Sequence, residues 1–224
     1  RSRGLGDVYK RQVVSGAEIK DINFENVELI TNDSADNKAK SMQAGIFGKV
    51  LNNTTLKNIR ASKVTLSDMP SNIGGLVSYL EYSTVEDCRM EDVSIRTAAY
   101  GNSALSVGGL VGYGKGLTVK NSYASGLDIE AKNGVRANGV GGLVGYVETF
   151  GSVSNAYSHG TINTAFGGTG GIVGAGSSDV SEAVSLTDIT SSTGDLGGIL
   201  GIATDNVSVD DVISIGNLSG SGSN

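Results

Sequence analysis

The sequence has 224 residues, of which 34 are glycine and one is proline, and its formal net charge is −6. Hydrophobic residues make up 38% of it and fall in ordered runs, which excludes a disordered chain, and the glycines follow no three-residue period, which excludes a collagen-like helix. Every Lys and Arg lies at or before Arg136, which argues against a nucleic-acid partner. No apolar run approaches the roughly 18 residues of a membrane span, so we expect no membrane insertion.

The two ends of the chain differ from its middle. Residues 1–12, RSRGLGDVYKRQ, share no pattern with residues 13–220 and resemble translated adaptor sequence, so we expect them to be a disordered artefact outside the fold. Residues 13–220 are predicted to form a single repeat domain. Residues 221–224, SGSN, are predicted to be a truncated tail, and the same chain is expected to continue at both ends.

The next feature in chain order is a short glycine-bounded apolar segment that recurs six times. The copies are Gly45–Gly48, Gly75–Ser78, Gly109–Gly112, Gly142–Gly145, Gly171–Gly174 and Gly198–Gly201. A tight core with variable spacing is typical of a solenoid, in which each turn keeps its strands and varies its loops. Glycine weakens strand interiors, so we expect pairs such as Gly108-Gly109 to form a tight corner, with the following Leu-Val entering the wall.

A second segment precedes the first copy and follows every copy, and its aligned positions form columns. One column is always aliphatic: Ile19, Leu56, Val85, Val119, Val153, Val180 and Val209. Two residues later the column is polar: Asp21, Asn58, Asp87, Asn121, Asn155, Glu182 and Asp211. The next is small or aliphatic: Ile22, Ile59, Cys88, Ser122, Ala156, Ala183 and Val212. A third apolar group comes after it, with its last three members in looser register: Val27, Val64, Val93, Leu127, Ile162, Ile189 and Leu218.

These columns predict an all-β fold, a right-handed parallel β-helix (β-solenoid) of about six to seven coils with three short strands per coil. Equivalent residues would stack roughly 4.8 Å apart, so the rod would be roughly 30 Å long. Inward columns must be apolar because residues above and below share one slot. The Asn/Asp column is predicted to lie at a corner, where these residues tolerate left-handed backbone and can form a hydrogen-bonded ladder.

Two segments show a specific resemblance to a known family. GGLVGYGKGLTVKNSYASG (Gly108–Gly126) and GGLVGYVETFGSVSNAYSHGTI (Gly141–Ile162) resemble GLUG repeats, whose pattern is GGLVG followed by Val-x-Asn-Ser/Ala-Tyr-Ala/Ser-x-Gly. The resemblance covers about residues 44–220 and weakens toward the N-terminus, where Arg60 and Arg89 replace the tyrosine. It implies a parallel β-helix of bacterial surface adhesins. It also implies kinship with regions upstream of the catalytic domain in zinc metallopeptidases that cleave immunoglobulin A.

The candidate catalytic and metal-binding residues are few. A zinc peptidase needs two histidines one helical turn apart, and the chain has only His159, so we expect an exposed or turn histidine. Cys88 is the single cysteine of the sequence, so neither an intramolecular disulfide nor a thiolate metal cluster can form. The other residues of its column are small or apolar, which predicts a buried, inert thiol. We therefore expect no catalytic, cofactor-binding or metal-binding residue, and no cofactor.

The carboxylates and tyrosines raise two further functional possibilities, a polysaccharide-cleaving site and a ligand-binding row of tyrosines. A polysaccharide-cleaving enzyme would need clustered acids, but those of the polar column are a whole coil apart, and pairs such as Glu86-Asp87 should point to opposite faces of a strand. Stacked tyrosines could bind a glycan or protein, or could pack neighbouring coils, which we favour. They form two columns: Tyr79, Tyr113 and Tyr146, and then Tyr123 and Tyr157.

The leading hypothesis is a non-catalytic structural or adhesive module of a large secreted or cell-surface bacterial protein, with a host or cell-surface protein or glycan as partner. The alternative is a spacer or substrate-positioning region of a secreted zinc metallopeptidase, similar to immunoglobulin A peptidases, whose catalytic domain lies elsewhere.

Overall fold

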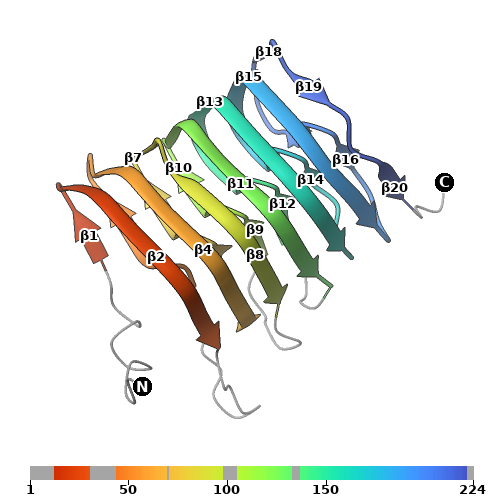
Figure 1. Cartoon of the computed structure of the whole chain (residues 1–224). Coiled ribbons are helices and arrows are strands. Elements are labelled where there is room, and N and C mark those ends of the chain that lie inside the picture. The colour runs from red at the N-terminus through yellow and green to blue at the C-terminus, as the bar shows by residue number, and fades with distance from the viewer. Residues whose placement is uncertain (1–12, 31–43, 70, 98–104, 133–136, 221–224) are drawn as a thin grey trace.

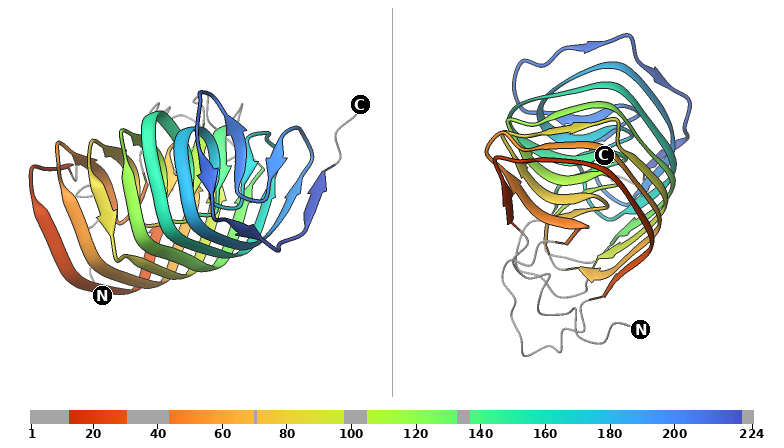
Figure 2. Two further views of the ribbon diagram at one scale, coloured as in Figure 1. Left: turned by 90° about the horizontal axis from the view of Figure 1, so that it is seen from above. Right: turned by 60° about the vertical axis from the view of Figure 1, so that its left-hand side comes forward.

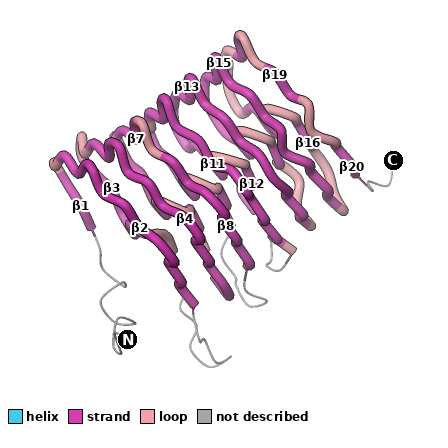
Figure 3. Tube along the Cα trace, in the orientation of Figure 1, coloured by secondary structure: helices cyan, strands magenta, loops and turns pink. Residues whose placement is uncertain are grey.

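The chain folds into a parallel β-solenoid of about five turns. The computed structural model describes residues 13–30, 44–69, 71–97, 105–132 and 137–220, and within these ranges the regular elements are strands, with no helix (Figure 3). The strands lie side by side from the N-terminal to the C-terminal end of the stack (Figure 1), and Figure 2 shows the coils from two further directions. The all-β prediction is therefore confirmed, whereas the prediction for residues 1–12 concerns residues outside the described ranges.

The strands range from two to 21 residues. They are β1 (Val13–Ser15), β2 (Glu18–Ile30), β3 (Phe47–Leu51), β4 (Thr55–Met69), β5 (Ile73–Gly74), β6 (Val77–Glu81), β7 (Thr84–Glu86), β8 (Arg89–Thr97), β9 (Leu105–Gly108), β10 (Val111–Lys115), β11 (Thr118–Ala131), β12 (Ala137–Gly141), β13 (Val144–Thr164), β14 (Thr169–Gly170), β15 (Val173–Ser191), β16 (Leu196–Gly197), β17 (Leu200–Ala203), β18 (Val209–Asp210), β19 (Ile213–Ser214) and β20 (Leu218–Gly220).

Two sheets make up the wall of the solenoid. A five-stranded sheet has the order β16-β14-β12-β9-β5, and a 15-stranded sheet contains the remaining strands. In each turn the chain passes from a short strand of the smaller sheet into a strand of the larger one, as from β12 into β13, and the strands pair in parallel with those of the next turn. Each of the five short strands therefore marks one turn.

The interior is built from stacked aliphatic residues, as the sequence columns predict. The first column stacks in register over its whole length, from Ile19 opposite Leu56 to Val180 opposite Val209. Val119, Val153 and Val180 are each at most 1% exposed, whereas Val209, in the last described coil, is 42% exposed. Burying these side chains away from water stabilises the coils, because each aliphatic residue packs on its neighbours above and below.

The third apolar group divides into two columns, at the point where the sequence alignment gives it a looser register. Val27, Val64, Val93 and Leu127 do stack, but Leu127 lies opposite Gly160. Ile162 lies opposite Ile129 instead, in a separate column that continues to Ile189 and Leu218. The reason is a register shift: Ser125-Gly126 of β11 lie opposite the single residue His159 of β13, so later coils are one residue shorter at this bend.

The paired glycines form a tight corner between the two sheets, as predicted. A Cβ on Gly108 would lie 2.1 Å from the carbonyl oxygen of Val111, and one on Gly109 would lie 2.3 Å from the carbonyl oxygen of Gly142 in the next coil. No side chain fits between backbones this close, which explains why glycine recurs at both positions. Leu110 and Val111, which come directly after the pair, are fully buried.

Candidate ligand-binding groove

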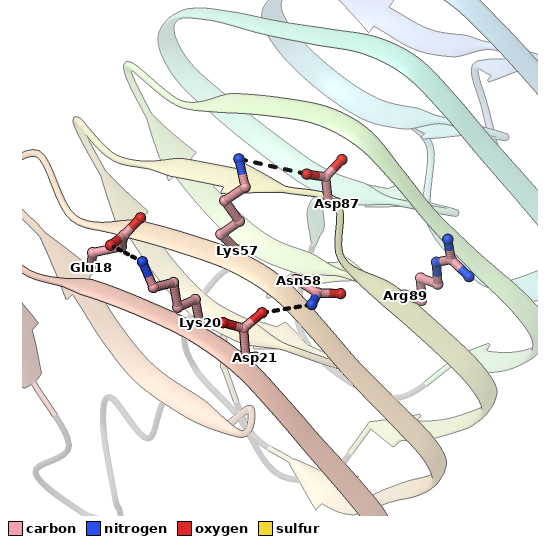
Figure 4. Close-up of a pocket in the computed structure, with 7 residues that line it drawn as sticks. All are labelled: Glu18, Lys20, Asp21, Lys57, Asn58, Asp87 and Arg89. Carbon is pink, nitrogen blue, oxygen red and sulfur yellow. Dashed lines mark hydrogen bonds and ion pairs between the residues drawn. The ribbon is translucent and has the colours of Figure 1, made fainter.

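Two adjoining hollows lie along one corner of the solenoid and share Asp87 and Arg89; together they are called the corner groove. The first, drawn in Figure 4, is lined by Glu18, Lys20, Asp21, Lys57, Asn58, Asp87 and Arg89. The second is lined by Asp87, Arg89, Asn121, Ser122, Tyr123, Asn155, Ala156, Tyr157, Glu182 and Val184. The groove is polar and open, and its residues come from equivalent positions of successive coils.

The predicted polar corner column runs through this groove. All seven of its members, from Asp21 to Asp211, have positive φ angles, between 45° and 58°. Asn58 Nδ2 donates to Asp21 Oδ1 (2.7 Å), Asn121 Nδ2 donates to Asp87 Oδ1 (3.2 Å), and Asn155 Nδ2 donates to Asn121 Oδ1 (2.9 Å). The left-handed corner and its hydrogen-bonded ladder are therefore both confirmed, because short polar side chains tolerate this backbone conformation and bond along the stack.

Substitution of Asn121 should separate the contribution of the ladder hydrogen bonds to stability from the contribution of the left-handed backbone. Asn121→Gly removes the side-chain hydrogen bonds but keeps the left-handed backbone, whereas Asn121→Ala also forces a Cβ into that conformation. We expect the alanine variant to be less stable than the glycine variant by about 1 kcal/mol, measured by urea unfolding of both proteins. Equal stability of the two variants would show that the left-handed corner does not constrain this position.

A second left-handed column was not anticipated from the sequence. Asn26, Lys63, Asp92 and Gly126 have φ angles of 55°, 54°, 54° and 60°, and they lie at the bend before the third apolar group. Lysine at one of these positions hides the pattern, because lysine is not typical of left-handed backbone.

The charged residues beside the corner alternate in sign from one coil to the next, from Lys57 through Glu86 to Lys120. Glu86 Oε1 lies 3.0 Å from Lys57 Nζ, and Glu86 Oε2 lies 3.3 Å from Lys120 Nζ, so one carboxylate bridges two lysines. Hydrogen bonds from these lysines lower the pKa of Glu86 below its ordinary value. Lys57 Nζ also lies 3.8 Å from Asp87 Oδ2.

The expectation that Glu86 and Asp87 point to opposite faces is therefore wrong. Both carboxylates reach Lys57 on the outer surface. The alternation of side chains holds only for extended residues, and Asp87, with φ of 55°, turns the chain.

Arginine and tyrosine form the next column outward from the corner. Arg60, Arg89, Tyr123 and Tyr157 lie opposite one another on successive coils, in the register that the sequence alignment gives. The Arg89 guanidinium lies 5.5 Å from the centroid of the Tyr123 ring, and the Tyr123 and Tyr157 centroids are 6.3 Å apart. His159 is exposed, as predicted, and its ring stacks on Tyr157 at 6.4 Å.

The other tyrosine column lies outside the groove. Tyr79 and Tyr113 stack with centroids 5.3 Å apart, and Tyr113 and Tyr146 continue the column at 5.5 Å. Burial, with hydrogen bonding to Glu148, raises the pKa of Tyr113 well above its ordinary value. These half-buried rings pack neighbouring coils against one another, which supports the packing interpretation for this column.

Cys88 is buried, as predicted from its column. Its Sγ donates to the carbonyl oxygen of Glu86 (3.2 Å), and its backbone N–H donates to Ser122 Oγ (3.0 Å). Burial raises the pKa of the Cys88 thiol from 9.0 to about 11. A neutral, enclosed thiol is a poor nucleophile and a poor metal ligand.

The raised pKa of Cys88 predicts a pH-dependent loss of stability. The folded state disfavours the thiolate, so the unfolded state ionises first, and stability should fall as pH rises from about 9 to about 11. With two pKa units between the states, the loss is about 2–3 kcal/mol. Urea unfolding of the wild type and Cys88→Ala across this range isolates the effect, because the variant lacks the thiol. Parallel pH profiles for the two proteins would contradict this assignment.

The carboxylates of the corner column are distributed along the stack, as expected from their spacing. Asp21 and Asp87 each accept a hydrogen bond from an asparagine of the next coil. In the described part of the chain, no three His, Cys, Asp or Glu residues are grouped so that they could hold a metal ion. The described residues also contain no helix long and apolar enough to span a bilayer.

Residues 136–163 match a family model described as the GLUG motif. The chain carries a GLUG motif. This segment contains the glycine corner at Gly141-Gly142, the ladder residue Asn155 and the groove residue Tyr157. Its pattern therefore consists of the residues that shape one coil and its part of the corner groove.

Two curated relatives extend the comparison beyond the GLUG motif. The chain is 27% identical over 166 residues to an immunoglobulin A1 protease of Streptococcus pneumoniae serotype 4 (strain ATCC BAA-334 / TIGR4). It is 25% identical over 165 residues to an immunoglobulin A1 protease of Streptococcus pneumoniae (strain ATCC BAA-255 / R6). Each match covers 72% of this chain and 8% of the relative, so the chain spans a small part of their length.

Proposed function

We propose that the chain is a non-catalytic repeat rod of a secreted, protease-associated bacterial protein, which holds flanking parts of that protein apart or positions a substrate for them. The observation that carries the proposal is the match of 72% of this chain to 8% of much longer immunoglobulin A1 proteases. A stacked solenoid suits a spacer because its length is set by the number of coils and its wall is rigid.

The finer architecture belongs to the same proposal. We infer a right-handed rod of six to seven coils with three short strands each. The seven members of the aliphatic column from Ile19 to Val209 support this number, because each coil contributes one of them.

The residues whose side chains could act in catalysis or bind a metal support a non-catalytic role. Cys88 is enclosed and neutral, His159 stacks on a tyrosine, and Asp21 and Asp87 take part in the corner ladder. Each side chain has a structural use.

Recovery of the full reading frame tests the proposal directly. A His-Glu-x-x-His motif on the same polypeptide is the expected result for a spacer of a zinc protease. A full-length frame without a protease domain would overturn the protease association. In parallel, the 224-residue chain should leave immunoglobulin A1 intact, and cleavage by this chain alone would contradict the non-catalytic role.

An adhesive role on the cell surface is the second candidate function. The corner groove favours it, because a row of exposed polar and aromatic side chains can contact an external glycan or protein. Binding to intact cells that is lost when the groove residues are changed would support adhesion, whereas binding that survives these changes would exclude the groove.

A further inference from the structure

We propose that the corner groove, together with Arg60 beside it, binds an extended, carboxylate-bearing oligosaccharide, with Arg89 and Arg60 pairing with its carboxylates and Tyr123 and Tyr157 stacking on its sugar rings. The inference rests on the proposed function, in which the rod is a non-catalytic module with an accessible wall. It adds the chemical class of the ligand and the residues that would recognise it.

The cationic side chains of this corner fall into two groups. Lys20 pairs with Glu18 at 2.8 Å, and Lys57 pairs with Glu86 at 3.0 Å, so these two lysines are already engaged. Arg60 and Arg89 are exposed, lie opposite each other on adjacent coils, and form no ion pair within the described residues. Figure 4 shows the Arg89 side chain at the edge of the first hollow, apart from the paired lysines. Two adjacent forked guanidinium groups without a carboxylate partner suit a carboxylate of a ligand.

The tyrosines provide surfaces beside these arginines. Tyr123 Oη donates to Glu91 Oε1 (2.6 Å), which holds its ring in place, and the Tyr157 ring continues the column one coil further. Both rings are half-buried and line the second hollow. An amphipathic ring of fixed orientation can pack against the C–H face of a sugar while the neighbouring polar groups bind its hydroxyls.

The corner ladder supplies those polar groups. Asn121 and Asn155 are exposed, and they repeat once per coil beside the tyrosines. Asp87 accepts a hydrogen bond from Asn121, and it shares Lys57 with Glu86, at 3.8 Å from Lys57 Nζ. A repeating row of this kind matches a repeating ligand that lies along the rod axis.

An extended peptide fits this wall less well than a sugar. The backbone groups of β11 and β13 are paired with neighbouring coils, so a peptide cannot be added there as a further strand. The groove lining also contains few aliphatic side chains to form the buried apolar contacts on which peptide binding depends.

Binding can be tested with the 224-residue chain and defined hexasaccharides by isothermal titration calorimetry at low salt. The probes are hyaluronan hexasaccharide and hexagalacturonate, which carry carboxylates, and chitohexaose, which does not. We expect at least one uronate to bind at least tenfold more tightly than chitohexaose. The double variant Arg60→Gln/Arg89→Gln should weaken that binding at least tenfold. Tyr157→Ala should weaken the binding of both the charged and the uncharged hexasaccharides, because stacking of the tyrosine ring on a sugar ring does not depend on the charge of the sugar.

Arg96→Gln is the matched control, because Arg96 already pairs with Asp128 and, at 3.1 Å, with Glu130. It should bind the uronate as the wild type does, and circular dichroism should show that all variants fold. Failure of both uronates to bind, equal binding of chitohexaose, or full binding by the arginine double variant would each overturn the proposal. Equal binding of a polyglutamate peptide would also overturn it, in favour of a peptide ligand. None of these results would affect the spacer role, which the reading frame decides separately.

Discussion

Gly141→Ala is expected to lower the free energy of unfolding by at least about 4 kcal/mol, enough to disrupt the central coils. A Cβ at this position would lie 2.0 Å from the carbonyl oxygen of Val144 and 2.7 Å from the backbone nitrogen of Gly174. Both are backbone atoms held by pairing between coils, so neither can move away as a flexible side chain could. Urea unfolding followed by circular dichroism measures the loss.

Gly167→Ala is the control for this substitution. The nearest atom to a Cβ on Gly167 is the backbone nitrogen of Asp195 at 3.3 Å, a separation that a small adjustment accommodates. We expect its stability to stay within about 0.5 kcal/mol of the wild type. If the two variants were equally stable, the close approach of backbones at the glycine corner would not be the reason for the repeated glycine pair.

Val153→Asp is the second substitution with a large expected effect, because it places a carboxylate inside the stack. Val153 is 1% exposed and lies between Val119 and Val180 in register. Neither neighbour can donate a hydrogen bond or offset a charge, so we expect a loss of at least about 4 kcal/mol or failure to fold. Expression yield and urea unfolding are the measurements.

Ser154→Asp, one residue further along the same strand, provides the comparison. Ser154 is half-buried on the outer face and lies opposite Lys120. An aspartate there faces a cation, so we expect unchanged stability or a gain of up to about 0.5 kcal/mol. A large loss in Ser154→Asp, or none in Val153→Asp, would contradict the assignment of inner and outer faces.

The two substitutions also probe how stability is distributed along the rod. Each coil contacts only its neighbours, so damage at Gly141 or Val153 should spread from the central coils outward. Hydrogen exchange should show the first loss of protection in β13 and in the strands paired with it, β11 and β15.

Several features could be predicted because they depend on residues of one kind recurring at one position. The aliphatic column from Ile19 to Val209 and the polar column from Asp21 to Asp211 are readable from the sequence, since a stacked slot accepts only similar residues. The corner ladder arises from the same logic, because Asn and Asp combine tolerance of left-handed backbone with short hydrogen-bonding side chains. The buried state of Cys88 is explained by the small residues that share its column.

The sequence by itself determined the all-β solenoid, its glycine corner, the aliphatic column from Ile19 to Val209 and the alignment that places Arg89 opposite Tyr123. Only the tertiary structure decided the register shift at His159, the shared outer face of Glu86 and Asp87, and the adjoining hollows along the corner. The physical reason is that a stacked slot accepts only similar residues, so the recurrence of one residue type at one position can be read from the sequence. The length of each bend and the direction of each turned side chain depend instead on the backbone path between slots.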